Sequence, residues 1–215
     1  MSRNRFQIIL KFLHITDYRK IRNREDPGYS PDSRFKPLLT FVNNRFKALY
    51  TPQRELSIDE SLVASRGKSV MKQYIPSKAA KFGIKFWVLV EACSGYVMNM
   101  SVYRGKTYDP TPRGEQQGTN VVMYLLRACE LLYKGYHVVC DSFFCSINLA
   151  RLLLSKGTYL TGTLRKNRPM PKTVKEANPN PGQTTFMRSG DILCVAHRGE
   201  KANKPCASRQ CAEST

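Results

Sequence analysis

The sequence predicts an α/β protein in which a central mixed sheet is flanked by helices. The first observation is the order of the periodic segments after residue 55, where strands are followed by helix, strand, helix and strand. The second is the nearly continuous apolar run IKFWVLVEA at residues 84–92, which is typical of a central strand. The third is size, because 215 residues with 41% hydrophobic content can bury a substantial core.

Two helices are expected before the sheet begins. Residues 1–20 predict an amphipathic helix with Ser2 as its cap, and we expect its apolar face to pack in the core. Residues 35–50 return to helical spacing and end before Pro52. The segment 19–34 carries Pro-Gly and Ser-Pro turn signals and predicts a loop. The apolar positions of the first helix are Phe6, Ile9, Leu10 and Leu13.

The middle of the chain changes to strand patterns. Strands are expected at 55–63, 70–75, 84–92 and 97–105. The last two are separated by Cys-Ser-Gly-Tyr and predict a hairpin.

Helices and strands then alternate. A helix is expected at 119–135 with Thr119 as its cap, and a second at 142–157 with Ser142 near its start. A short buried strand is expected at 136–141, a strand at 158–165, and one more strand at 187–198, after a loop that begins at residue 166. The chain therefore divides into a helical segment at 1–54, a sheet domain at 55–198 and an irregular tail at 199–215.

Charge is the strongest compositional signal. The chain has 35 Lys and Arg residues against 16 Asp and Glu, a formal net charge of +19. Such an excess favours a nucleic-acid partner, with an anionic membrane surface as the weaker alternative. No apolar run is long enough to span a bilayer, and the N-terminus does not read as a secretory signal. Seven cysteines without a CxxC pair indicate a reducing compartment rather than a zinc site.

Two acids stand at the predicted strand ends. Asp59 falls in the first strand, although Asp is disfavoured in strands, and Asp141 ends the strand between two helices. Two carboxylates on neighbouring strands can hold Mg²⁺, which takes oxygen ligands and leaves positions open for phosphate. The alternative for Asp141 is a helix cap, and for Asp59 a solvated strand-end acid.

Basic residues cluster near both acid-bearing segments. If the clusters flank the acids, they form a rim for DNA, with Tyr74, Phe82 and Tyr108 as interleaved aromatics. The alternative is a solvated basic face. The first cluster comprises Arg66, Lys68, Lys72, Lys78, Lys81 and Lys85, and the second Arg165, Lys166, Arg168 and Lys172.

Three stretches of the chain resemble the piggyBac-type DDE transposases and their domesticated derivatives. MSRNRFQIILKFLH resembles the opening helix of that family. Residues 56–106, with their Tyr-Ile-Pro and Gly-Ile-Lys elements, resemble the first catalytic block. Residues 135–168, with Asp-Ser-Phe-Phe and Thr-Gly-Thr-Leu-Arg, resemble the second block, and the likeness extends to about residue 195.

The resemblance implies an RNase H-like fold and a triad of Asp residues that binds Mg²⁺ for cut-and-paste DNA transposition at TTAA targets. Asp59 matches the first catalytic Asp of the family, and Asp141 matches the second. The metal would activate water, and then a DNA 3′-hydroxyl, for in-line attack on phosphodiesters. A nuclear location and a homodimer are the corresponding expectations, with no membrane and no small-molecule substrate.

The chain departs from the family at the third acid, which lies in a Gly-Val-Asp segment that is absent here. The likeness fades after about Arg198, and the Cys-rich C-terminal module is absent. We therefore expect a truncated or frame-shifted derivative, or one fragment of a longer product, with an incomplete RNase H-like sheet. The acids that follow Asp141 are Glu176, Asp191, Glu200 and Glu213.

Three functions follow from these observations. The first is a transposase-derived DNA-binding domain whose partial DDE site, with Mg²⁺ as its ancestral cofactor, no longer cleaves. The second is an active Mg²⁺-dependent transposase or nuclease that uses Asp191 or an acid from a second chain. The third is a degenerate product that serves as a protein-interaction module.

Overall fold

The structure is a computed structural model that describes residues 1–200 and the backbone of 206–211. It divides into two compact units, and the strands β1 (Glu55–Ala64), β3 (Phe82–Glu91) and β4 (Val97–Val102) contribute residues to both. Unit 1 comprises residues 1–49, 62–86 and 102–109, and unit 2 comprises 50–61, 87–101 and 110–215. The three domains expected from the sequence stay a prediction.

Unit 1 begins with two helices, α1 (Arg3–Phe12) and α2 (Lys36–Leu49), joined by a loop that contains the short 3₁₀ helix η1 (Tyr18–Lys20). Ser2 caps α1 as predicted, because its hydroxyl accepts a hydrogen bond from the Arg5 amide at 3.4 Å. A second 3₁₀ helix, η2, covers Lys106–Tyr108.

The expectation that α1 packs its apolar face in the core is wrong. No residue of α1 is buried, and Phe6 is 49% exposed and Ile9 47% exposed. The helix is also shorter than predicted, because the chain leaves it at Leu13 in an extended conformation. Periodicity shows that a helix has an apolar face, but it does not show that the same chain supplies a surface to bury that face.

The strands form one mixed sheet, as predicted. Its order is β2-β3-β1-β5-β6-β9-β8-β7, with β4 also paired to β3. The central strands β1, β5 and β6 are parallel, whereas β7, β8 and β9 pair antiparallel. The bounds are β1 Glu55–Ala64, β2 Lys72–Tyr74, β3 Phe82–Glu91, β4 Val97–Val102, β5 His137–Cys140, β6 Tyr159–Thr163, β7 Thr184–Ser189, β8 Ile192–His197 and β9 Cys206–Cys211.

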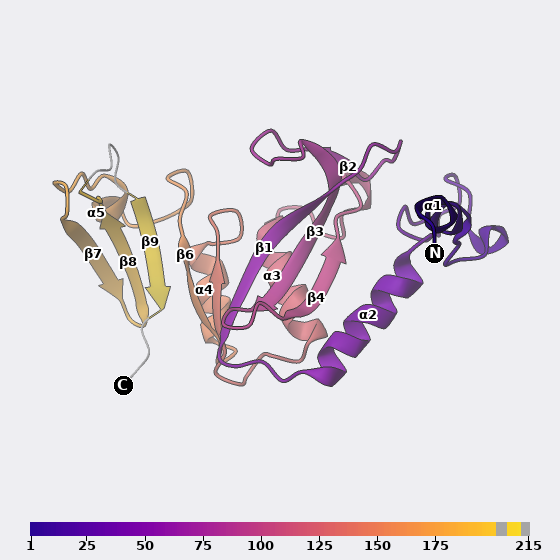
Figure 1. Cartoon of the computed structure of the whole chain (residues 1–215). Helices are drawn as coiled ribbons and strands as arrows, with labels where there is room; N and C mark the ends of the chain where they lie inside the picture. The colour runs from indigo at the N-terminus through magenta and orange to yellow at the C-terminus, as the bar shows by residue number, and fades with distance from the viewer. Residues whose placement is uncertain (201–205, 212–215) are drawn as a thin grey trace. The chain divides into compact units, whose positions relative to one another are not determined.

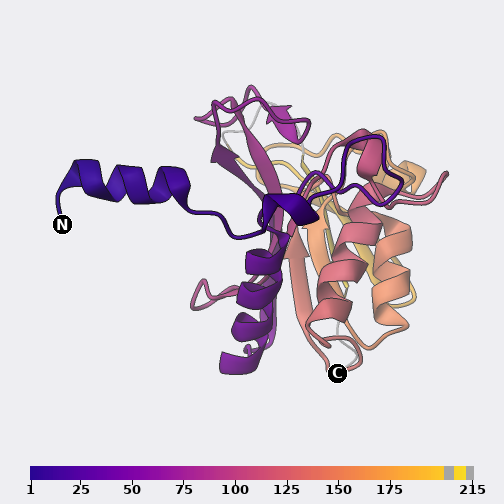
Figure 2. The same cartoon turned by 90° about the vertical axis from the view of Figure 1, so that its right-hand side faces the viewer.

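The core of unit 2 lies between these parallel strands and the helices α3 (Gln117–Ala128) and α4 (Ile147–Leu154), which cover one face of the sheet (Figures 1 and 2). Alternate strand residues point toward the helices, and Leu56, Val138 and Leu160 are completely buried. The helices contribute buried leucines, among them Leu125 and Leu149. The same alternation along the strands places the intervening strand residues, including Glu55 and His137, on the face opposite the helices.

Both helices begin at other residues than the sequence suggested. The N-cap of α3 is Gln116 rather than Thr119, and the helix ends at Ala128 before two residues with positive φ, Glu130 and Tyr133. The N-cap of α4 is Ser146 rather than Ser142, and its hydroxyl accepts a hydrogen bond from the Leu149 amide at 3.1 Å.

The C-terminal part contains more strand than expected. Instead of one strand at 187–198, the chain forms a β7–β8 hairpin that turns at Gly190, whose φ is +59°. Residues 206–211, in the segment expected to be irregular, form β9 between β6 and β8. Its short polar sequence carries no strand periodicity. The segment is a strand because ladder bonds to two neighbouring strands determine its conformation. A short helix, α5 (Lys172–Lys175), precedes the hairpin.

Candidate functional site

The parallel pairing of β1 and β5 brings Asp59 and Asp141 to adjacent positions. The last paired residues are Ile58 and Cys140, and each aspartate is the next residue along the chain. Neighbouring strands lie about 4.8 Å apart, so two carboxylates at matched positions can approach one ion. Both side chains are exposed and both belong to unit 2.

The two positions differ in one respect from the prediction that both end a strand. Asp141 directly follows the last residue of β5, whereas Asp59 lies inside β1, which continues to Ala64. What ends at Asp59 is the pairing of β1 with β5.

Each carboxylate uses one oxygen for a local backbone bond. Oδ1 of Asp59 accepts a hydrogen bond from the Glu60 amide at 2.7 Å. Oδ1 of Asp141 accepts one from the Phe143 amide at 2.9 Å, which forms a turn and delays the start of α4 to Ile147. Within the described residues, the second oxygen of each carboxylate makes no hydrogen bond. This pair of exposed oxygen donors fits Mg²⁺, which often binds one or two carboxylates together with substrate phosphates.

Aromatic packing fixes the turn that follows Asp141. The ring of Phe143 stacks on Trp87 with centroids 5.2 Å apart, and Phe144 meets the same indole edge to face at 5.4 Å. Phe144 is fully buried. The start of α3 also approaches closely, because a Cβ on Gly118 would lie 2.8 Å from the carbonyl oxygen of Phe143.

Two of the predicted DNA-binding arginines bond to this turn. Arg165 Nε donates to the hydroxyl of Ser142 at 3.2 Å, and Arg168 donates to the carbonyl oxygen of Phe143 at 3.0 Å. These two arginines bond to the two residues Ser142 and Phe143 near Asp141, so they place positive charge beside the turn and hold it in place. The other two members of the second cluster, Lys166 and Lys172, are exposed.

The first basic cluster lies in unit 1. Arg66 and Lys72 line a cavity of about 570 Å³ together with Phe82. Phe82 lies against Tyr74 at 4.8 Å, and the two rings are 54% and 57% exposed. The remaining members lie on β3 or on the loops next to β2 and β3, which pair antiparallel. They are Lys68, Lys78, Lys81 and Lys85. A continuous rim made by both clusters stays a prediction.

Three residues that support the site, Gly162, Cys140 and Cys145, were missed by the sequence interpretation. Gly162 pairs with Cys140, and a Cβ there would lie 2.5 Å from the Cys140 carbonyl oxygen and 3.2 Å from Cys145 Sγ. Cys140 and Cys145 are buried, and the hydrogen bond between them, with burial, raises the pKa of the Cys140 thiol. The close approach of three strand and turn segments explains why a glycine stands at this position.

Asp191 does not join the pair. The register aligns Cys140 with Gly162, Arg209 and Cys194, so Asp191 lies at the opposite end of β8 from the level of Asp141. Three strand spacings of about 4.8 Å and four residues of about 3.3 Å separate the two acids by roughly 20 Å. Among the described residues, no group of three or more His, Cys, Asp or Glu side chains gathers where it could hold a metal.

The helices in the described part of the chain are too short or too polar to cross a membrane.

Comparisons with known proteins agree with this architecture. Residues 1–209 match the family described as Transposase IS4. PiggyBac transposable element-derived protein 3 of Homo sapiens is 34% identical over 170 residues, which cover 78% of this chain and 27% of that protein. PiggyBac transposable element-derived protein 2 of Homo sapiens is 27% identical over 169 residues, covering 78% and 28%. The chain thus spans about a quarter of the length of these relatives.

A solved structure shows the same fold. The chain matches the cryo-EM structure of a piggyBac transposase synaptic complex with hairpin DNA at a TM-score of 0.87 and 27% sequence identity. The match covers all of this chain and 44% of the other. The family match over residues 1–209, the 34% identity to a piggyBac-derived protein and the structural match to a piggyBac transposase agree, and the chain belongs to the piggyBac-type transposase family.

Proposed function

We propose that the chain is a DNA-binding protein derived from a piggyBac transposase, which retains two carboxylates of a DDE metal site and does not cleave DNA efficiently. The observation that carries the proposal is the parallel register that sets Asp59 beside Asp141, next to a turn held by Arg165 and Arg168. A nuclear location follows from a DNA target.

Charge supports DNA as the partner. A net charge of +19 produces a strong attraction to phosphates, and the structurally similar piggyBac transposase was solved with hairpin DNA. In this proposal the exposed Lys166 and Lys172 contact the backbone near the acids, and the first cluster contacts it from unit 1. Phosphate contacts position the protein without reading base sequence.

Asp59 and Asp141 would hold Mg²⁺ with their outward oxygens, completed by DNA phosphate oxygens. When bound, such an ion lowers the pKa of a coordinated water or hydroxyl and stabilises charge at the phosphate during in-line displacement. With two protein carboxylates and Asp191 roughly 20 Å away by register, metal affinity and geometry both suffer, so cleavage is absent or very weak.

A second candidate is a metal-dependent transposase or nuclease whose third acid comes from a second chain. The observation in its favour is the unengaged oxygen on each of the two exposed aspartates. It predicts Mg²⁺-dependent nicking that disappears on substitution of either aspartate.

DNA binding tests the leading proposal. Fluorescence anisotropy with a short labelled duplex should show saturable, strongly salt-dependent binding by the wild type. Asp59→Ala should bind at least as well as the wild type, because its carboxylate repels phosphate rather than attracting it. The double variant Lys166→Gln/Lys172→Gln should reduce the slope of log affinity against log salt by about 2.

Arg127→Gln/Arg151→Gln is the matched control, because it removes the same charge from exposed positions on the helices of unit 2. Equal slopes in both double variants would refute the assigned surface. Absence of any saturable binding by the folded wild type would refute the DNA-binding function, and absence of cooperative unfolding would favour the degenerate-product interpretation.

A further inference from the structure

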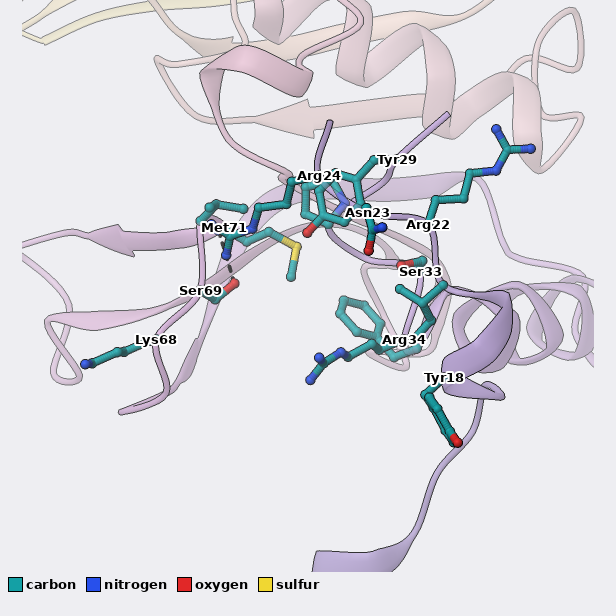
Figure 3. Close-up of a pocket in the computed structure, with 14 residues that line it drawn as sticks. Tyr18, Arg22, Asn23, Arg24, Tyr29, Ser33, Arg34, Lys68, Ser69 and Met71 are labelled. Carbon is teal, nitrogen blue, oxygen red and sulfur yellow. Dashed lines mark hydrogen bonds between the residues drawn. The ribbon is translucent and has the colours of Figure 1, made fainter. Parts of the chain in front are cut away.

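A second basic site lies within unit 1, and Lys68 is the one residue that it shares with the basic clusters predicted from the sequence. The loop at residues 18–35 and the segment 68–71 surround a cavity of about 600 Å³ (Figure 3). Its lining includes four cationic side chains and no acidic one. The cations are Arg22, Arg24, Arg34 and Lys68.

The loop that forms most of this cavity has a defined conformation. The hydroxyl of Thr16 donates to the carbonyl oxygens of Ser33 at 3.1 Å and Arg34 at 3.2 Å, which ties the two ends of the loop together. Inside the loop, Oδ1 of Asp26 accepts hydrogen bonds from the Gly28 amide at 2.8 Å and from Arg22 at 3.3 Å. The cavity is therefore formed before any ligand binds, which reduces the ordering cost of binding.

The cations of the cavity are not equivalent. Arg22 forms an ion pair with Asp26, and its guanidinium group points away from Lys68 in Figure 3. Arg34 extends toward the side of the cavity on which Lys68 lies (Figure 3). Arg24, Arg34 and Lys68 are exposed and have no acidic partner in the part of the chain that the structure describes.

Aromatic and apolar surface lies beside these charges. Tyr29 lines the cavity, is half-buried, and is held edge to face against Tyr108 with ring centroids 6.0 Å apart. Met71 is buried, and its amide donates to Ser69 Oγ at 3.2 Å, the bond marked in Figure 3. A fixed aromatic ring next to unpaired arginines is the combination that binds a base together with its phosphate.

We propose that this cavity binds an unpaired nucleotide of a DNA strand, with Arg24, Arg34 and Lys68 on the phosphates and Tyr29 against the base. The volume of about 600 Å³ lies in the range of sites for small organic ligands and admits a nucleotide but not a duplex. This inference rests on the proposed DNA-binding function, and it adds a single-strand site that contains none of the candidate metal ligands.

The test compares Arg24→Gln/Arg34→Gln with the charge-matched control Arg127→Gln/Arg151→Gln in the full chain. The probes are a labelled oligothymidylate and a labelled duplex of the same length. The cavity variant should lose about tenfold in affinity for the single strand and about 1.4 in its salt slope, because two phosphate contacts are removed. Its affinity for the duplex should fall no further than that of the control.

Tyr29→Leu separates a base contact from simple charge attraction. It should weaken binding to oligothymidylate while leaving binding to an abasic oligomer of equal charge unchanged. Thermal unfolding of every variant checks the fold. Arg24→Gln alone supplies a milder variant, because its exposed side chain makes no bond within the described residues.

The outcomes separate the two proposals. If the wild type binds the duplex but the cavity and control variants lose single-strand affinity equally, the cavity proposal is overturned and DNA binding stands. If the wild type binds neither probe, DNA binding itself fails. A selective loss of single-strand binding in the cavity variants supports the assignment.

Discussion

Gly162 lies so close to Cys140 that a methyl group on its α-carbon would stand 2.5 Å from the Cys140 carbonyl oxygen. The neighbour is strand backbone, which cannot move aside without shifting the end of β5. Asp141 is the next residue, so the space that Gly162 leaves open determines where that carboxylate stands.

Substitution of Gly162 by Ala should therefore destabilise unit 2 and displace Asp141. Overpacking of this kind typically costs about 1–3 kcal/mol in the free energy of unfolding, measurable by urea denaturation. Gly67→Ala is the control, because a Cβ there would meet only Ser65 Oγ at 3.6 Å. Equal stability of the two variants would contradict the close packing described for β5 and β6.

The turn after Asp141 should depend on its aromatic stack. Phe143→Leu removes the ring that stacks on Trp87 at 5.2 Å, and we expect a loss of about 1 kcal/mol in the free energy of unfolding. Trp87 is the single tryptophan of the chain, so its fluorescence reports the change directly. Tyr124→Leu, at a side chain that is 56% exposed, should leave stability and emission nearly unchanged.

Glu91 at the end of β3 should make unit 2 sensitive to acid. The Ser94 hydroxyl and amide donate to Glu91 Oε2, the amide at 2.7 Å, and these bonds lower the pKa of Glu91. A carboxyl whose folded pKa is depressed contributes stability above its unfolded pKa of about 4.3, and this contribution is lost as pH falls through the folded value.

Ser94→Ala should therefore reduce stability at neutral pH and flatten the loss of stability below about pH 4. Urea unfolding measured at a series of pH values checks this expectation. The same pH profile in Ser94→Ala and wild type would show that the hydroxyl does not control the titration of Glu91. Ser61→Ala, at an exposed residue of β1 in unit 2, serves as the control.

The sequence was sufficient for the elements whose own side chains carry the pattern. The alternation in residues 55–63 and the apolar run in 84–92 predicted β1 and β3 within two residues of their observed bounds. The alignment of Asp59 with Asp141 was also within reach, because both are the first acids after short apolar strand segments.

Features set by distant contacts were out of reach. β9 depends on ladder bonds to β6 and β8, and the turn that precedes α4 packs its two phenylalanines on the distant Trp87. The cavity at residues 18–35 was interpreted only as a polar loop, because nothing local indicates that Lys68 approaches Arg34. Contacts between segments far apart in sequence leave little trace in local periodicity.

Plasmid nicking in Mg²⁺ or Mn²⁺ tests the central claim most directly. Wild type, Asp59→Ala, Asp141→Ala and the control Asp191→Ala are compared on the same supercoiled DNA, after DNA binding by each has been confirmed. The account predicts that all four bind DNA and that none nicks it above background. Nicking by the wild type and Asp191→Ala that disappears in both Asp59→Ala and Asp141→Ala would contradict it and show that a third metal ligand completes the site.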